Sequence, residues 1–448
     1  VMDFSKIKTV HFIGIGGIGT SAIARMFVLE GKKVSGSDMA ESEVTKELQD
    51  AGVVVDVGNE EKGIPKDCEL VIYTTAIPQD HPELLEAKKR GIPILSYPEA
   101  LGVISKDKYT IAITGTHGKT TTTAMVAKIL MDAGLDPTVI VGSFLLDVAR
   151  GSPRSDLKSE ERSDLKGTPR TNFVAGKSKY LVVEGCEYRR SFLNLLPEIL
   201  VITNIDADHL DYYKDLTDIK SAFAELAAKL PHDGVLIDEG KYGGISLPDG
   251  FTLRIPGKHN ISNAKVAVAR ALKIPDATAL NSLADFSGTW RRFEYRGKAP
   301  NGALVYDDYG HHPTEIEATL QGARELFPID KGGGSGGLSP KIVVVFQPHL
   351  YSRTKQHLEG FASAFKEASS VILLPIYPAR EKDHGDINSQ MVVDAIKKQG
   401  KDAHLVQTFN EAASLAQNLC GAGDIIITLG AGETNKVADL LVRKGESS

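Results

Sequence analysis

The sequence predicts an α/β protein of three domains, each built on a mostly parallel sheet. Short runs of β-branched and other apolar residues alternate with Ala-rich amphipathic stretches along the whole chain, which is typical of parallel sheets with helical crossovers. The chain has 448 residues, of which 42% are hydrophobic and 25% are charged. At roughly 150 residues per domain this length favours three domains, and the composition excludes collagen-like, coiled-coil and wholly disordered chains.

Composition shifts along the chain indicate where the domains begin and end. We expect the first over residues 1–106, the second over 107–288 and the third over 289–448. The charged segment from Ser105 to Lys108 is typical of a linker. Residues 148–170 are rich in Arg, Lys, Ser, Asp and Pro, so we expect them to form a surface insertion in the second domain.

The apolar runs predict the strands of each sheet. In the first domain they are Thr9–Ile13, Lys33–Ser37, Val53–Val57, Leu70–Thr74 and Pro93–Ser96. In the second domain they include Tyr109–Thr114, Tyr180–Glu184 and Ile199–Ile205. In the third they lie near 303–307, 341–346, 371–376, 404–408 and 424–429.

Charge and hydropathy exclude several classes of protein. The net charge of -6 is not the basic footprint of a nucleic-acid-binding protein. No apolar run approaches the roughly 20 residues of a membrane helix, and the first residues lack the apolar core of a signal peptide. Three cysteines lie far apart without metal-binding spacing, which is typical of reduced thiols. We therefore expect a soluble, cytoplasmic protein with no nucleic-acid or membrane partner.

A glycine-rich loop follows the first predicted strand. Gly14, Gly16 and Gly19 give the pattern G-x-G-x-x-G before a helix, as in Rossmann-like domains. Such a loop lets backbone N–H groups approach a diphosphate at the helix N-terminus. Asp38 ends the second strand, where a ribose-binding carboxylate would lie. The pattern does not distinguish NAD from a nucleotide sugar, because both present a diphosphate and a ribose.

A second phosphate loop follows the strand Tyr109–Thr114. It reads Gly115-Thr-His-Gly-Lys-Thr120 and opens a helix that we expect to reach Asp132. Ile113 stands where the common G-x-x-x-x-G-K-[ST] loop has its first glycine, so this loop is shortened. Its chemistry is intact, because Lys119 can neutralise phosphate charge and the Thr120 hydroxyl can reach Mg²⁺.

Two further strands of the second domain end in groups that can bind a metal. Glu184 ends one strand, and His209 follows the next. Ligands collect beyond the carboxyl ends of parallel strands, so both should face Thr120 across one phosphate site. Mg²⁺ prefers oxygen ligands, which makes a histidine unusual. Asp206 and Asp208 are expected to be turn or cap residues.

The third domain places polar and cationic groups after two of its strands. One segment runs from Tyr306 to Glu315, with Pro313 at the first position of a helix. The other runs from Val345 to Thr354. Groups of this kind can hold substrate carboxylates, so the third domain is expected to close over a substrate.

Seven segments in all three expected domains resemble the Mur ligases of bacterial cell-wall synthesis. They are HFIGIGGIGTSAIA (11–24), GTHGKTTTT (115–123), NIDADHLDYY (204–213), GKHNISNA (257–264), RRF (291–293), DDYGHHPTEI (307–316) and VFQPHLYSRT (345–354). The shortened phosphate loop is specific to this superfamily. The segments at 307–316 and 345–354 are more similar to the alanine-adding members than to their relatives that add D-glutamate, diaminopimelate or a dipeptide.

The resemblance implies an ATP-dependent amide ligase of peptidoglycan precursor synthesis. ATP would phosphorylate the lactyl carboxylate of UDP-N-acetylmuramate, and the amine of L-alanine would attack the acyl phosphate. Mg²⁺ and a lysine can spread the phosphoryl charge of such a step. ATP and Mg²⁺ are thus the implied cofactors, and we expect a monomer or a homodimer.

The resemblance also implies roles for individual residues. Those expected at the UDP diphosphate are Gly14, Gly16, Gly17 and Gly19, with Asp38 nearby. Those expected to hold ATP are Gly115, Thr116, His117, Gly118, Lys119, Thr120, Thr121, Asn260, Asn263, Arg292 and Asp308. Those expected to shape the amino-acid region are Tyr309, His311, His349 and Arg353. The implied metal ligands are Thr120, Glu184 and His209, and the implied catalytic residues are Lys119, Glu184, His209, His311 and Arg353.

The sequence departs from the family pattern in places, and other functions stay open. After Glu184 the usual Ala-Asp-Glu-Ser reads Gly-Cys-Glu-Tyr, and Leu350 stands where alanine-adding members usually have arginine. The stretch between Leu230 and Gly257 is also much shorter than usual. The alternatives are a ligase that attaches a whole tripeptide to the same UDP-sugar, an NAD-dependent dehydrogenase and a non-catalytic nucleotide-binding module. A dehydrogenase would leave Lys119 without a role.

Overall fold

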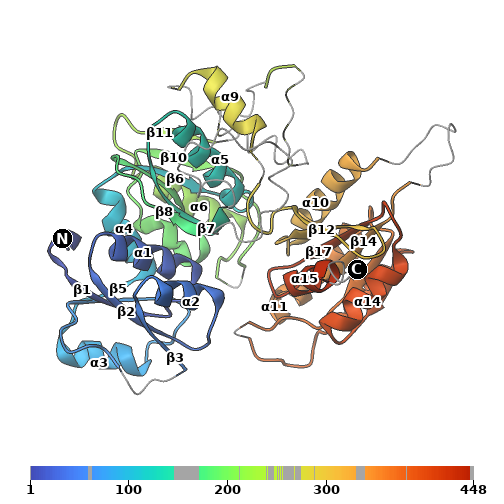
Figure 1. Cartoon of the computed structure of the whole chain (residues 1–448), viewed down its shortest axis with the longest axis horizontal. Helices are drawn as coiled ribbons and strands as arrows, with labels where there is room; N and C mark the ends of the chain where they lie inside the picture. The colour runs from blue at the N-terminus through green and yellow to red at the C-terminus, as the bar shows by residue number, and fades with distance from the viewer. Residues whose placement is uncertain are drawn as a thin grey trace. The chain divides into compact units, whose positions relative to one another are not determined.

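Three separate β-sheets organise the chain, and the computed structural model gives it a three-domain α/β architecture (Figure 1). The structure describes residues 2–58, 63–145, 171–210, 212–238, 240, 247–249, 251, 253, 255, 267, 274–286, 288–328, 339–379 and 381–443. Contacts divide the chain into two compact units, residues 1–252 with 263–287 and residues 253–262 with 288–448. The first two sheets lie in the first unit and the third sheet lies in the second.

The first sheet has five parallel strands in the order β3-β2-β1-β4-β5. The strands are β1 (Thr9–Ile13), β2 (Lys33–Asp38), β3 (Val54–Val57), β4 (Leu70–Tyr73) and β5 (Ile94–Ser96). The helices are η1 (Phe4–Lys6), α1 (Ile18–Leu29), α2 (Glu43–Asp50), α3 (Pro82–Arg90) and α4 (Tyr97–Lys106). The strand order reverses between β1 and β4, which places the glycine loop after β1 where such sheets bind ligands.

The second sheet has six strands in the order β11-β10-β6-β9-β7-β8, and only the β7–β8 pair is antiparallel. The strands are β6 (Tyr109–Thr114), β7 (Thr138–Leu145), β8 (Thr171–Val174), β9 (Tyr180–Glu184), β10 (Ile199–Ile202) and β11 (Val235–Ile237). The helices are α5 (Lys119–Asp132), η3 (Tyr188–Asn194), α6 (Leu216–Ala227) and α9 (Asp276–Ala284). Strand β8 contacts the first domain through Asn172, which donates a 2.8 Å hydrogen bond to Ser21 of α1.

The third sheet has six strands in the order β12-β13-β17-β14-β15-β16, and only the β12–β13 pair is antiparallel. The strands are β12 (Glu294–Lys298), β13 (Leu304–Asp308), β14 (Ile342–Phe346), β15 (Ser370–Leu373), β16 (Asp402–Leu405) and β17 (Ile425–Leu429). The helices are α10 (Pro313–Leu326), α11 (Tyr351–Gln356), α12 (Leu358–Ala364), α13 (Ser389–Lys398), α14 (Phe409–Leu419) and α15 (Asn435–Arg443). The core of this unit lies on both faces of the sheet, in two separate clusters of buried apolar side chains.

The structure confirms the predicted parallel α/β class and corrects one local prediction. Ser105 is not in a linker. It lies in the last turn of α4, where its buried hydroxyl donates to the carbonyl of Gly102 at 2.8 Å. The predicted insertion at 148–170 lies outside the described residues. Within the part of the chain that is described, no helix combines the length and apolarity needed to cross a membrane.

Candidate functional site

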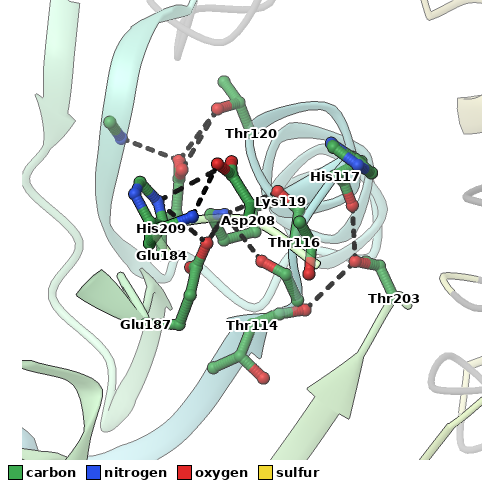
Figure 2. A network of polar contacts seen from close by, with 12 residues as sticks. Thr114, Thr116, His117, Lys119, Thr120, Glu184, Glu187, Thr203, Asp208 and His209 are labelled. Atoms are coloured by element: carbon green, nitrogen blue, oxygen red, sulfur yellow. Dashed lines mark hydrogen bonds and ion pairs between the residues drawn. The ribbon is translucent and has the colours of Figure 1, made fainter. Parts of the chain in front are cut away.

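The carboxyl ends of β10, β6 and β9 meet in the second domain, because these strands are neighbours in the sheet. Strand β6 leads into residues 115–118 and α5, and β9 ends at Glu184. The turn after β10 carries His209. Figure 2 shows the polar cluster that forms where these three strand ends come together.

Two glycines shape the loop between β6 and α5. Gly115 and Gly118 have φ angles of +133° and +78°, and a Cβ on Gly115 would lie 2.0 Å from the Thr203 hydroxyl. Asn204, after β10, accepts the His117 N–H at 2.9 Å. Gly118 is the N-cap of α5 and has no side chain to accept the first N–H groups of the helix. A helix start of this kind suits a phosphate group.

Lys119 turns back into this loop. Its ammonium donates to the carbonyl oxygens of Gly115 at 2.6 Å and Thr116 at 3.0 Å, and lies 2.9 Å from Oε2 of Glu187. Burial is the largest single influence on the pKa of Lys119 and would lower it, but the nearby acidic groups, Glu187 first among them, and the hydrogen bond to Glu187 together raise that pKa above its usual value. The loop therefore holds a permanent cation beside the helix N-terminus.

Glu184 and Thr120 form a pair of oxygen groups next to the loop. The Thr120 hydroxyl donates to the Glu184 carboxylate at 3.1 Å and 3.2 Å, and the backbone N–H of Gly142 donates to the same carboxylate at 2.9 Å. Hydroxyl and carboxylate oxygens are ligands that Mg²⁺ prefers, so these residues fit that ion. Across the described residues, no group of three or more His, Cys, Asp or Glu side chains forms a complete metal site.

Glu187 is the group in this cluster to which the sequence analysis gave no role. Its side chain is 4% exposed and lies between Lys119 and His209, whose Nε2 is 3.5 Å from its Oε1. Burial, the largest single influence, would raise the pKa of Glu187, but the charges of Lys119 and His209 and the hydrogen bonds to them together lower it below its usual value. His209 thus faces Glu187, and its expected role as a metal ligand stays a prediction. Two sequence signals pointed to Glu187: it lies three residues after Glu184, and it keeps the glutamate of the family's Ala-Asp-Glu-Ser stretch.

Strained backbone marks the same elements. Arg189, Arg190 and His209 have φ angles of +51°, +55° and +56°, in the left-handed region that side chains other than glycine rarely adopt. The third domain has similar values at Arg291 and Leu350, +55° and +70°. Such strain persists only where surrounding contacts enforce it, and it concentrates at functional sites.

The glycine loop of the first domain is held together by its own backbone and by Asp38. The Gly16 N–H donates to Asp38 Oδ2 at 2.8 Å, and the Gly14 N–H donates to Ser37 at 2.8 Å. Gly17 caps α1 without a side-chain hydrogen bond, so this helix start can also take a phosphate. A Cβ on Gly19 would lie 2.4 Å from the ring of Tyr97. Asp38 therefore orders the loop, and a contact with ribose stays a prediction.

The predicted amino-acid residues lie together within the third domain. Strands β13 and β14 flank β17, so the segments after their ends meet. The rings of Tyr309 and His311 are 5.6 Å apart, and those of His311 and His349 are 6.0 Å apart. Arg353 NH1 lies 3.4 Å from His349 Nδ1, and the Arg292 guanidinium lies 5.3 Å from the Tyr309 ring.

Two further residues, Asp308 and Arg291, make buried polar contacts within the third domain. Asp308 accepts the N–H groups of Phe293 at 2.8 Å and Gly310 at 2.7 Å, and burial raises its pKa. Arg291, which the sequence analysis passed over for Arg292, is 3% exposed and pairs with Asp307 at 2.7 Å. Adjacent arginines look alike in sequence, and only burial separates them. The expected contact of Asp308 with ATP stays a prediction.

The remaining predicted residues divide into those near the phosphate loop and those that are not described. Asp206 lies 3.4 Å from His117 and accepts the N–H of Ala207, so it is the turn residue that we predicted. Thr116 accepts the Asp206 N–H at 2.9 Å. Thr121 is buried on α5. The predicted adenine-contacting residues Asn260 and Asn263 lie outside the described part of the chain.

Comparison with known proteins covers all three domains. Residues 9–109 match the model of the Mur ligase family catalytic domain, 113–242 the Mur ligase middle domain, and 291–432 the Mur ligase glutamate ligase domain. The chain is 38% identical to the UDP-N-acetylmuramate–L-alanine ligase of Clostridium kluyveri, over 99% of both chains. It is also 38% identical to the protein of that name from Clostridium acetobutylicum, over 98% of both.

Solved structures give the same relationship. The UDP-N-acetylmuramate-alanine ligase of Thermotoga maritima superimposes with a TM-score of 0.78 at 29% identity, covering 98% of this chain and 99% of that one. The murein peptide ligase of Psychrobacter arcticus superimposes with a TM-score of 0.67 at 21% identity, over 98% of this chain and 99% of that one. The second likeness shows the shared fold alone.

Proposed function

Because this chain belongs to the Mur ligase family, we propose that it joins L-alanine to the lactyl carboxylate of UDP-N-acetylmuramate at the expense of ATP. The observation that carries the proposal is 38% identity, over nearly the whole chain, to ligases named for this reaction. The reaction belongs to peptidoglycan precursor synthesis in the cytoplasm. Residues 1–106 would bind the UDP-substrate, 107–288 would bind ATP, and 289–448 would contribute the amino-acid groups.

The proposed reaction has two steps, and it gives roles to the residues that lie together at the strand ends. A lactyl carboxylate oxygen attacks the γ-phosphorus of ATP, and ADP leaves. The amine of L-alanine then attacks the carbonyl carbon of the acyl phosphate, inorganic phosphate leaves, and the nitrogen loses its proton to form the amide. Lys119 neutralises negative charge on the transferred phosphoryl group.

Mg²⁺ would be held by Thr120 and Glu184, with His209 as the further candidate. When bound, the ion neutralises charge on the transferred phosphoryl group. The α5 N-terminus orients the nucleotide phosphates. Tyr309, His311, His349 and Arg353 would surround the amino acid from the third domain.

The proposed function is tested by substrate-dependent phosphate release and by ligand-induced thermal protection. We expect phosphate release with ATP, UDP-N-acetylmuramate and L-alanine, and much less when a tripeptide replaces L-alanine. UDP-N-acetylmuramate should raise the unfolding temperature, because a ligand of the native state stabilises it by RT ln(1 + [L]/Kd). Protection by NAD with no response to the UDP-sugar would instead indicate the dehydrogenase, and preference for the tripeptide would indicate the recycling ligase.

Replacement of Glu184 by glutamine should weaken the dependence on Mg²⁺. The amide keeps an oxygen near Thr120 but loses the charge that a divalent cation requires, so we expect the Mg²⁺ concentration for half-maximal activity to rise at least about tenfold. Titration of Mg²⁺ against phosphate release measures this. UDP-N-acetylmuramate binding should survive, since it uses the first domain. An unchanged Mg²⁺ titration would exclude Glu184 as a ligand.

Arg353 should carry the carboxylate of L-alanine. Leu350 cannot offer the paired N–H groups that an arginine gives a carboxylate. Arg353 lies three residues further along the chain, with its guanidinium 3.4 Å from His349 Nδ1. We expect Arg353→Ala to raise the KM for L-alanine roughly 10- to 100-fold and Leu350→Arg to lower it. Lys355→Ala is the matched control, because Lys355 lies on the same helix α11 as Arg353 but pairs with the exposed Asp386. A KM for L-alanine that is unchanged in Arg353→Ala would place the carboxylate elsewhere.

A further inference from the structure

The ammonium of Lys119 has no hydrogen left for a nucleotide while it contacts Glu187. An ammonium has three N–H groups. Two of them serve the carbonyl oxygens of Gly115 and Thr116, and the third meets the Glu187 carboxylate, whose oxygens lie 2.9 Å and 3.1 Å away. The two carbonyls belong to the loop itself, so Glu187 is the partner that can be exchanged.

Glu187 is anchored in this position by its backbone. Its carbonyl oxygen accepts the Tyr213 hydroxyl at 2.5 Å and the Arg190 N–H at 2.9 Å. Tyr213 is 1% exposed, so the anchor lies in the core between α6 and the strand ends. The backbone of Glu187 is therefore held in place, with the carboxylate beside Lys119.

The same carboxylate also faces His209, at 3.5 Å. In Figure 2, Glu187 and His209 lie on the same side of Lys119. The Glu187 carboxylate thus lies between Lys119 of the phosphate loop and His209. This is where we expect the negatively charged terminal phosphate of a bound nucleotide to lie. Resting on the proposed function, we propose that Glu187 is a positioning residue that stands in for the terminal phosphate of ATP. In this role Glu187 holds Lys119 and His209 until ATP binds, and Lys119 then contacts the γ-phosphate in place of Glu187.

This role has a consequence that a purely structural ion pair does not have. If the pair were only structural, its loss would loosen Lys119 and weaken the binding of every nucleotide. Loss of a stand-in removes a competitor for Lys119 and a like charge beside the γ-phosphate, so a triphosphate should bind more tightly. The affinity for a diphosphate, which lacks the γ-phosphate, should increase little.

The test compares nucleotide affinities of the full chain by isothermal titration in EDTA, with the β,γ-imido analogue of ATP and with ADP. We expect Glu187→Gln to lower the Kd of the imido analogue about tenfold and to change the Kd of ADP much less. Glu187→Asp withdraws the carboxylate by one methylene, so its Kd should lie between those of the wild type and the Gln variant. Glu198→Gln is the matched control, because Glu198 accepts the Thr110 N–H at the opposite end of the same sheet. It removes the same charge and should leave both affinities unchanged.

Each outcome decides the proposal. An unchanged or weaker affinity of Glu187→Gln for the imido analogue overturns it, and an equal gain for ADP overturns the assignment to the terminal phosphate. If Glu187→Gln does not fold, the Glu187→Asp variant decides. Tighter binding of the imido analogue than by the wild type supports the proposal, and unchanged or weaker binding overturns it. A wild-type chain that binds neither nucleotide, in EDTA or with Mg²⁺ added, would instead overturn the proposed function.

Discussion

Replacement of Lys119 by alanine should lower the rate of amide formation by ~10³-fold or more. Lys119 is the cation that the phosphate loop supplies, held by the carbonyl oxygens of Gly115 and Thr116. Its raised pKa keeps it charged, so it can neutralise phosphoryl charge throughout the usual pH range. Phosphate release measured with saturating ATP, UDP-N-acetylmuramate and L-alanine reports the loss.

The control for this variant lies on the same helix. Lys128 pairs with Asp132 at 2.9 Å near the other end of α5, so Lys128→Ala removes an equal charge away from the phosphate loop and should retain activity. UDP-N-acetylmuramate should still raise the unfolding temperature of Lys119→Ala, because the glycine loop after β1 is untouched. Normal ATP-dependent amide formation by Lys119→Ala would show that the phosphate site is elsewhere.

The sequence predicted the central strands better than the edge strands, for a physical reason. The predicted bounds of Thr9–Ile13, Tyr109–Thr114 and Tyr180–Glu184 are those observed. Strands buried on both faces read as continuous apolar runs. The edge strands β8, β11 and β12 were missed. Strands β8 and β11 have only four and three residues, and β12 reads Glu-Tyr-Arg-Gly-Lys with partly exposed side chains. Strand β7 carries the same β-branched signal as β6 and was predictable.

The site was predictable as far as sheet topology determines it. Because parallel strands end at one edge, placing Lys119, Glu184 and His209 after three strands was enough to expect them in one cluster. The partner of each group was not predictable. His209 faces Glu187 at 3.5 Å, and this depends on a left-handed turn at His209, which no residue pattern specifies.

Arg291 should stabilise the third domain by far more than a surface ion pair does. Its guanidinium donates to Asp307 at 2.7 Å, to Gly430 at 2.7 Å and to Gly432 at 2.9 Å, and it is 3% exposed. These bonds join the start of β12 to the end of β13 and to the loop after β17. Arg291→Met leaves the buried Asp307 carboxylate without its cation, which costs about 3–5 kcal/mol. Thermal unfolding should show the transition of this unit lowered by roughly 10 °C.

Arg292, the adjacent arginine, provides the matched control, and we expect its replacement to affect nucleotide binding instead of stability. The Arg292 guanidinium lies 5.3 Å from the Tyr309 ring, whereas the buried pair with Asp307 belongs to Arg291. Arg292→Met should therefore change the unfolding temperature little while raising the KM for ATP, which Arg292 is proposed to contact. The double variant Arg291→Met with Asp307→Leu should recover part of the lost stability, because replacing both members of a buried pair removes the unpaired charge. Equal destabilisation by Arg291→Met and Arg292→Met would contradict the division of roles between the two arginines.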